Sequence, residues 1–291
     1  MTEYKGRIIK GIGGFYYVDT ADGVFECRAR GVLRKEGITP LVGDMAEISA
    51  DTASMTGAVE AVQPRKNKLL RPPVANVDQV AIVTATARPR PNLLLLDKMI
   101  AAAEYAGAQI LLCFNKTDID DGQEIAEIYK TAGFEVLLLS AETGENTDKL
   151  VGYLKDKVTV FAGNSGVGKS SLLNRVFGSE VFATGEISDR AERGRHTTRH
   201  SELSALEYGG YIIDTPGFGS FDIALLEAED CVRMFREFEK YTDNCRFSDC
   251  SHTVEKGCGV LKALSEGKIA PSRHDSYCRI VREINESKKR R

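Results

Sequence analysis

The chain has 291 residues, 42% of them hydrophobic and 28% charged, with a formal net charge of −3. These values are typical of a globular protein of two or three domains, and they argue against one that coats nucleic acid indiscriminately. No apolar run approaches the ~18 residues of a membrane helix and no apolar block follows Met1, so we expect a cytoplasmic chain without membrane contact. Seven cysteines without an export signal favour metal binding or plain burial over disulfide bonds.

The first sixty residues or so alternate short β-prone runs with turn signals. The runs are Gly6–Lys10, Phe15–Val18, Val24–Arg28, Val42–Ile48 and Gly57–Val62. Asp22-Gly23 between two of them is typical of a hairpin turn. The regular spacing predicts a closed barrel of about five strands, so we expect an N-terminal OB-type β-barrel domain over residues 1–70. The prolines in Pro64–Lys68 and Arg71–Pro73 predict a linker at its end.

After about residue 75, continuous apolar runs alternate with helical patterns. The apolar runs are Val77–Ala85, Gln109–Phe114, Phe134–Ser140, Val158–Ala162 and Tyr211–Ile213. The helical patterns are Leu93–Tyr105, Gln123–Ala132 and Ser171–Phe177. Apolar runs of this kind indicate parallel strands buried on both faces, and the alternation predicts an open α/β sheet. We place this α/β domain at residues 71–222 and a helical, cysteine-bearing domain at residues 223–291.

The segment Gly163–Ser170 reads G-N-S-G-V-G-K-S and matches a phosphate-binding loop, with a β-run before it and a helical pattern after it. In such a loop the backbone N–H groups surround the phosphates, the lysine reaches the terminal phosphates and the hydroxyl binds Mg²⁺. A chance glycine-rich turn is the alternative that this context disfavours. We therefore predict Lys169 as a catalytic residue and Ser170 as a Mg²⁺ ligand. The predicted phosphate contacts are Gly163, Asn164, Ser165, Gly166, Val167, Gly168, Lys169, Ser170 and Ser171.

Two further motifs identify the nucleotide. Asp214-Thr-Pro-Gly217 follows a predicted strand, where the carboxylate can hold Mg²⁺ through water and the Gly217 amide can contact a γ-phosphate. Asn115-Lys-Thr-Asp118 ends another strand, and the Asp118 carboxylate can accept two hydrogen bonds that guanine offers and adenine does not. GTP is therefore the predicted nucleotide. Its predicted contacts beyond the phosphate loop are Asn115, Lys116, Thr117, Asp118, Ser140, Ala141, Asp214 and Gly217.

The order of these motifs is unusual. Most P-loop GTPases begin with the phosphate loop and end with the base-reading motifs, whereas here the base-reading motifs come first. An open sheet tolerates such a circular permutation because its termini lie at the surface. Since D-T-P-G then stands last, the segment that responds to the γ-phosphate leads directly into the C-terminal domain.

The group that activates water is not at its usual position. Ras-like enzymes place a glutamine just after D-x-x-G, but this chain has Phe218 there, whose ring cannot position water. The basic stretch Gly194–Arg199 lies where GTPases carry a Mg²⁺-binding threonine, and we favour Thr198 over Thr197 as that ligand. His196 is the best candidate to orient the water, because imidazole accepts a proton or a hydrogen bond near neutral pH. Contact of His196 with RNA or solvent is the alternative.

Four residues near the C-terminus form a candidate metal site. Cys245, Cys250, His252 and Cys258 supply three sulfurs and one imidazole within fourteen residues. Four ligands of this type predict a closed tetrahedral Zn²⁺ site with a structural role. Unmetallated buried cysteines are the alternative. His274 and Cys278 can compete as ligands, but their distance along the chain makes them the poorer choice.

The combined motifs resemble the circularly permuted family of ribosome small-subunit-dependent GTPases (GTPase A) over essentially the whole chain. The residues that carry the resemblance are Val42-Gly-Asp44, N-K-T-D, G-N-S-G-V-G-K-S, Gly194–Arg199, D-T-P-G-F and the Cys/His cluster. The resemblance implies a multidomain α/β protein with an OB domain, a permuted GTPase that converts GTP to GDP and phosphate, and a zinc domain. It also implies a role in late maturation of the small (30S) ribosomal subunit, whose binding stimulates hydrolysis.

We expect a monomer whose partners are GTP, GDP and the small ribosomal subunit with its rRNA. OB barrels bind oligonucleotides through one sheet face, and the basic tail Lys288–Arg291 adds phosphate contacts. Barrel residues suited to RNA, if they are not core or solvated surface, are Tyr16, Tyr17, Arg28, Arg30, Arg34 and Lys35. The alternatives are a GTP-switched RNA-binding factor of another pathway with little intrinsic catalysis, and a metabolic or signalling GTPase without RNA.

Overall fold

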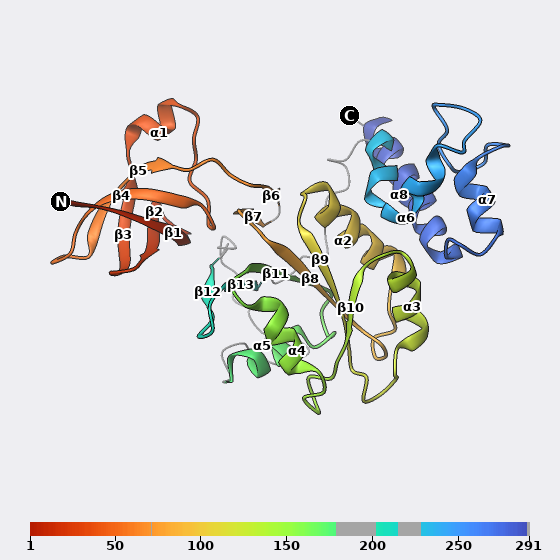
Figure 1. Cartoon of the computed structure of the whole chain (residues 1–291). Helices are drawn as coiled ribbons and strands as arrows, with labels where there is room; N and C mark the ends of the chain where they lie inside the picture. Colours follow the sequence, from red (N-terminus) through yellow and green to blue (C-terminus); the bar gives the residue numbers. More distant parts are fainter. Residues whose placement is uncertain (71, 179–201, 215–227, 290–291) are drawn as a thin grey trace. The chain divides into compact units, whose positions relative to one another are not determined.

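The computed structural model describes residues 1–70, 72–178, 202–214 and 228–289 (Figure 1). The chain divides into two compact units. The first contains Met1–Gln79, Tyr153–Phe161 and Ile187–Pro216, and the second contains Val80–Gly152, Ala162–Glu186 and Gly217–Arg291. Within the described part of the chain, no helix is both long and apolar enough to cross a membrane.

The N-terminal residues form a closed barrel with the strand order β1-β2-β3-β5-β4. The strands are β1 (Thr2–Ile12), β2 (Phe15–Thr20), β3 (Gly23–Ala29), β4 (Met45–Asp51) and β5 (Thr56–Val62), and a short helix α1 (Gly31–Lys35) precedes β4. All neighbouring strands are antiparallel except β3 and β5. Alternate residues of β4 point inward, so that Ala46, Ile48 and Ala50 are buried with Phe25. The predicted barrel is confirmed.

The segment after the barrel, expected to be only a linker, contains a small hairpin of β6 (Lys68–Leu70) and β7 (Pro73–Ala75). Its Ala75 N–H donates to the carbonyl oxygen of Val42 at 2.9 Å. Gly43 is required here, because its φ is +92° and a Cβ would lie 2.0 Å from the Ala75 carbonyl oxygen. The buried Asp44 accepts hydrogen bonds from Arg65 Nε at 2.7 Å and Nη2 at 2.8 Å. The V-G-D segment therefore holds the hairpin against the barrel.

The second sheet has six strands in the order β10-β9-β8-β11-β13-β12. The strands are β8 (Gln79–Ala85), β9 (Gln109–Asn115), β10 (Glu135–Leu138), β11 (Val158–Ala162), β12 (Ser204–Ala205) and β13 (Tyr211–Asp214). Parallel pairs join β9 to β10 and β11 to β13, while β12 runs antiparallel to β13. Every residue of β8 and β11 is buried, which confirms the prediction of strands covered on both faces. The edge strand β12 was not predicted, because two residues carry no periodicity.

The helices follow the strands as predicted, with additions. They are α2 (Leu93–Tyr105), α3 (Gln123–Thr131), α4 (Thr147–Leu154), α5 (Lys169–Phe177), the 3₁₀ helix η3 (Ala228–Met234), α6 (Arg236–Thr242), α7 (Gly259–Ser265) and α8 (Pro271–Lys289). α2 begins at Leu93, as predicted. The Asn92 side chain caps this end by accepting a hydrogen bond from the Leu95 N–H at 3.1 Å. α4 is an addition to the predicted set.

The C-terminal helices share a core with α2, and both belong to the second unit (Figure 1). Phe235, Phe238 and Tyr277 pack with ring centroids 5.2 to 5.3 Å apart. Beside them lies Arg273, whose side chain is only 1% exposed. Its Nη1 donates to Asp97 of α2 at 2.6 Å, and its Nε donates to Glu237 of α6 at 2.7 Å. One guanidinium therefore joins α8, α6 and α2.

Candidate nucleotide site and metal centre

The phosphate loop connects β11 to α5 and depends on the conformational freedom of its glycines. Gly163, Gly166 and Gly168 have φ values of +143°, +76° and +91°. A Cβ on Gly163 would lie 2.1 Å from the Val83 carbonyl oxygen, so the backbone passes close to β8 at this point. Lys169 Nζ donates to the carbonyl oxygens of Gly163 at 2.7 Å and Asn164 at 3.0 Å. The loop thus curls around the ammonium group of Lys169.

Replacing Gly163 with alanine is expected to lower the free energy of unfolding by more than the ~1–2 kcal/mol that a left-handed backbone costs an L-residue. The excess comes from the clash with Val83. Gly166→Ala is the matched control, because its φ is also positive but its nearest neighbour would lie 3.9 Å from the new Cβ. Urea unfolding of both variants measures the difference, and equal losses would contradict the close approach.

Asn115 joins three separate segments. It ends β9 and is 1% exposed. Its side-chain Nδ2 donates to the Val167 carbonyl oxygen of the phosphate loop at 2.9 Å, and its Oδ1 accepts from the Ala141 N–H at 2.9 Å. Lys116 Nζ donates to the Gly166 carbonyl oxygen at 2.8 Å. The structure therefore brings together the N-K-T-D motif, Ser140-Ala141 and the phosphate loop, which are far apart in the sequence.

The Asp118 carboxylate is exposed and held from one side. Ser140, which is fully buried, donates its hydroxyl to Asp118 Oδ1 at 2.5 Å. Neighbouring Thr117 donates its hydroxyl to Glu145 Oε2 at 2.7 Å. An ionised carboxylate only accepts hydrogen bonds, so this arrangement suits the paired N–H donors at the edge of guanine.

Some of the predicted residues cannot be placed. His196, Thr197, Thr198 and Gly217 lie outside the described residues, and Asp214 ends β13 without a described side chain. The residues that contact the base-reading loops but were not predicted include Glu145 and Arg175. Neither belongs to a motif, so no sequence signal marks them.

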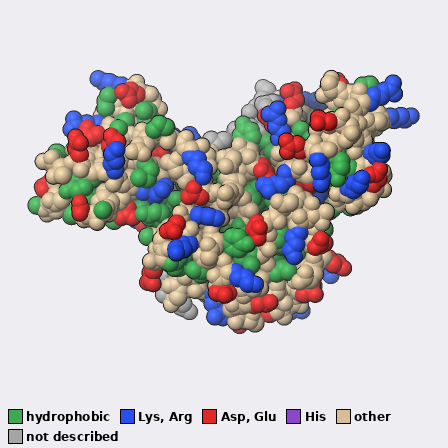
Figure 2. Space-filling model, in the orientation of Figure 1, with side chains coloured by type: hydrophobic (Ala, Val, Ile, Leu, Met, Phe, Trp, Pro, Cys, Tyr) green, Lys and Arg blue, Asp and Glu red, His purple; other side chains and the backbone are tan. Residues whose placement is uncertain are grey.

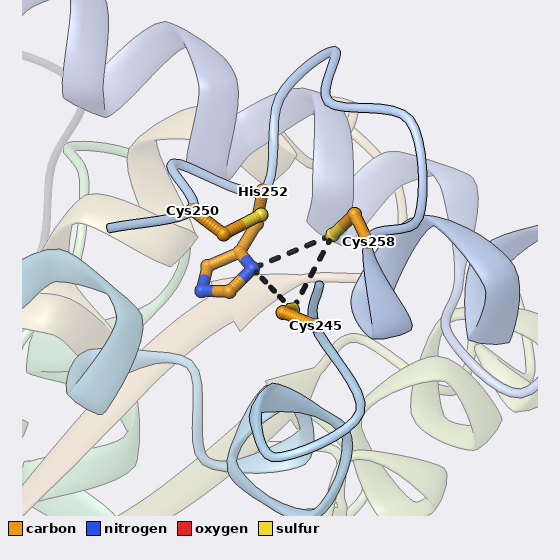
Figure 3. A group of neighbouring side chains, drawn as sticks. All are labelled: Cys245, Cys250, His252 and Cys258. Carbon is orange, nitrogen blue, oxygen red and sulfur yellow. Dashed lines mark hydrogen bonds between the residues drawn. The ribbon is translucent and has the colours of Figure 1, made fainter. Parts of the chain in front are cut away.

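The four predicted metal ligands lie together in the second unit (Figure 3). One donor atom from each of Cys245, Cys250, His252 and Cys258 lies within 4.8 Å of the others. His252 Nδ1 is 3.5 Å from Cys245 Sγ and 3.4 Å from Cys258 Sγ, and these two sulfurs are 3.9 Å apart. Zn–S bonds of about 2.3 Å in a tetrahedron place the sulfurs about 3.8 Å apart. The cluster can therefore hold a metal ion.

Backbone groups and α8 organise this cluster. The N–H groups of Gly259 and Leu261 donate to Cys245 Sγ at 3.3 Å and Cys258 Sγ at 3.4 Å. His274 Nε2 donates to the His252 carbonyl oxygen at 2.8 Å. His274 thus contacts the backbone of a ligand residue rather than the ligand atoms. Neither His274 nor Cys278 belongs to the four-residue group.

The titration behaviour of the cluster follows from its burial. Burial raises the pKa of the Cys250 thiol to about 12 and raises the pKa of Cys258. Burial also lowers the pKa of the His252 imidazole. A divalent cation stabilises thiolates and binds neutral imidazole, so metal binding would release protons from the cysteines.

Comparison with known proteins identifies the family. The sequence matches the RsgA GTPase family over residues 62–224 and the RsgA N-terminal domain family over residues 5–58. The chain belongs to the RsgA GTPase family. A relative from Caldanaerobacter subterraneus subsp. tengcongensis, named "Small ribosomal subunit biogenesis GTPase RsgA", is 46% identical over 100% of this chain and 99% of its own length. A relative of the same name from Alkaliphilus metalliredigens is 44% identical over 98% of this chain and 99% of its own length.

Two solved structures resemble the chain over nearly its whole length. YjeQ from Thermotoga maritima has a TM-score of 0.83 and 33% identity, covering 97% of this chain and 99% of the other. YloQ, described as a circularly permuted GTPase, has a TM-score of 0.81 and 32% identity, covering 98% of this chain and 96% of the other. The predicted permuted fold is confirmed, and the chain, as a member of the RsgA family, is a GTPase.

Proposed function

We propose that this GTPase acts in late maturation of the small ribosomal subunit, binds its rRNA and hydrolyses GTP faster when bound to the subunit. The relatives of matching length are named for small-subunit biogenesis, which supports the choice of partner. The observation that best supports the nucleotide site is the pair of hydrogen bonds made by the Asn115 side chain. They connect the N-K-T-D motif and Ser140-Ala141 to the phosphate loop. The chain is proposed to act as a monomer in the cytoplasm.

The proposed nucleotide contacts follow from this connection. The phosphate loop Gly163–Ser171 surrounds the phosphates, and Lys169 neutralises their charge as the γ-phosphoryl group is transferred. Asp118 accepts hydrogen bonds from guanine, with Asn115, Lys116 and Thr117 shaping its loop and Ser140-Ala141 supporting the base edge. Gly217 senses the γ-phosphate. These contacts orient GTP, which is the main contribution of a protein to phosphoryl transfer.

Mg²⁺ is the proposed cofactor for the bound GTP, and it would neutralise phosphate charge there. Ser170, the second residue of α5, offers a hydroxyl oxygen, a donor of the kind that Mg²⁺ prefers. Thr198 would supply a second oxygen, and Asp214 at the end of β13 would act through water. We propose His196 as the group that orients the attacking water.

The rRNA contacts are proposed to come from individual basic side chains of the barrel. Figure 2 shows Lys and Arg side chains interspersed with Asp and Glu over the visible face, as the net charge of −3 suggests. Arg34 and Lys35 of α1 are exposed, and Arg28 lies 4.4 Å from the ring centroid of Phe15. Arg30 instead pairs with Glu60 at 2.9 Å. We propose Arg28, Arg34 and Lys35 as phosphate contacts whose affinity falls with salt.

GTP turnover with and without purified small subunits tests the proposed function. We expect the subunit to stimulate hydrolysis, and His196→Ala to remove most of that stimulation while the variant still binds the subunit. Turnover that the subunit leaves unchanged, despite RNA binding, would instead favour a GTP-switched RNA-binding factor of another pathway. Failure to co-sediment with subunits or RNA at low salt would favour a GTPase without an RNA partner.

Zn²⁺ is the proposed metal of the Cys/His cluster, held by Cys245, Cys250, His252 and Cys258 in a structural role. Three thiolates and an imidazole are the donors that Zn²⁺ favours over Mg²⁺ or Ca²⁺, and they leave no position open for water. The ion would add cross-links at the edge of the core that these helices share with α2.

Removing one ligand is expected to release the metal. Cys258→Ser should lower the zinc content from one ion per chain to much less than one. It should also increase hydrogen exchange in α7, whose first turn is capped by the Cys258 sulfur. Cys278→Ser is the matched control, since Cys278 lies outside the four-residue group. Elemental analysis of the purified variants measures the content. Loss of zinc from Cys278→Ser but not from Cys258→Ser would refute the ligand assignment.

A further inference from the structure

Arg175 contacts the loop that follows β10, although it belongs to a different part of the chain. It lies in α5, the helix that begins at Lys169 of the phosphate loop. Its Nε donates to the carbonyl oxygen of Ala141 at 2.9 Å, and its Nη2 donates to the carbonyl oxygen of Glu142 at 2.5 Å. One guanidinium thus binds two consecutive carbonyl groups of residues 140–145, which we name the base loop.

The base loop is shaped around this guanidinium. Gly144 has a φ of +85°, and a Cβ there would lie 3.3 Å from Arg175 Nη1. The loop has no regular secondary structure, so its position depends on such contacts. A planar guanidinium with donors in a fixed fork is suited to hold two carbonyl groups at once.

Ala141 is held at both of its backbone polar groups. Its N–H donates to Asn115 Oδ1, and its C=O accepts from Arg175 Nε, both at 2.9 Å. Asn115 in turn donates to Val167 of the phosphate loop. The base loop is therefore linked to the phosphate loop and its helix by two routes, one through Asn115 of the N-K-T-D motif and one directly through Arg175.

The rest of α5 does not depend on Arg175 for its position. Leu172 and Leu173 are fully buried and Val176 is 8% exposed, so these side chains hold the helix in the core. Arg175 itself is exposed. Its removal should thus affect the base loop more than the helix.

We propose that Arg175 is a positioning residue for guanine recognition, which holds the base loop at a fixed distance from the bound phosphates. The inference rests on the proposed nucleotide site. Without Arg175 the base loop would keep its tie to Asn115 but gain freedom at Ala141 and Glu142. Binding of the base would then have to order the loop, and this free-energy cost would lower the affinity for the base. The phosphate contacts would be unaffected.

Competition against a fluorescent GDP analogue tests this role in the full-length protein. Arg175→Ala should weaken GDP binding about tenfold, which corresponds to about 1.4 kcal/mol. It should change the binding of inorganic pyrophosphate, which contacts only the phosphate loop, by less than about twofold. Arg175→Lys should be intermediate, because an ammonium group is not a planar fork. Lys149→Ala, an exposed cation in α4, is the control and should match the wild type.

Three results would overturn the inference. Equal weakening of GDP and pyrophosphate would show that Arg175 merely supports the phosphate loop, and unchanged GDP binding would show that it has no role. A wild type that fails to bind GDP would overturn the proposed nucleotide site together with this inference. If Arg175→Ala does not fold, Arg175→Gln keeps much of the side chain without its charge and is judged by the same comparison.

Discussion

Replacing Asp118 with asparagine is expected to change the preferred base from guanine to xanthine. The carboxylate accepts from the ring N–H and the exocyclic amine of guanine, whereas an asparagine amide offers one acceptor and one donor. Xanthine has a carbonyl oxygen where guanine has the amine, so it complements the amide. Because a site built for one hydrogen-bond pattern rejects a ligand that lacks it, we expect GDP affinity to fall about a thousandfold or more.

Competition binding of GDP and xanthosine diphosphate measures this change. Asp148→Asn is the matched control, since Asp148 is an exposed carboxylate in the first turn of α4. Its affinities should equal those of the wild type. If Asp118→Asn keeps its affinity for GDP, the Asp118 carboxylate does not contact the base, even though Ser140 orients it.

Replacing Arg273 with methionine is expected to lower the free energy of unfolding by about 3–5 kcal/mol, because two buried carboxylates lose their common partner. Asp97 is fully buried and the Glu237 side chain is 4% exposed. Burial raises the pKa of Asp97, and the guanidinium opposes that shift. Arg273 also lies 4.4 Å from the ring centroid of Phe235, so packing is lost together with charge.

Arg279→Met in the same helix provides the control. Arg279 pairs with Asp275 at 3.0 Å, but both side chains are more than half exposed, at 55% and 60%. An exposed pair of this kind contributes about 0–1 kcal/mol. Urea unfolding of both variants, monitored by a probe that reports on the C-terminal helices, separates the two cases. Similar losses in both would mean that the buried network contributes no more than a surface ion pair.

The sequence predicted those parts of the fold whose signal is local. Continuous apolar runs identified β8 and β11, and alternation with turn residues identified the barrel. The β6–β7 hairpin was missed, because Pro72 and Pro73 are typical of a linker and the hairpin is held by a hydrogen bond from Ala75 to Val42, far away in the sequence. Its formation depends on tertiary contacts rather than on propensity.

The candidate sites divide in the same way. The glycine positions of the phosphate loop and the spacing of the metal ligands are properties of short segments, so their residues could be named in advance. The bond between Arg175 and Ala141 joins residues 34 positions apart and follows only from how α5 packs. The roles of His196 and Thr198 remain predictions, since both lie outside the described residues.

Calorimetric titration of the wild type with GDP and with ADP tests most directly whether the permuted motifs form one guanine nucleotide site. The contacts at Asn115 and Asp118 predict one GDP per chain and an affinity for ADP that is weaker by about a thousandfold or more. Equal affinities for GDP and ADP would contradict the account, because the phosphate loop would then bind nucleotides without reading the base.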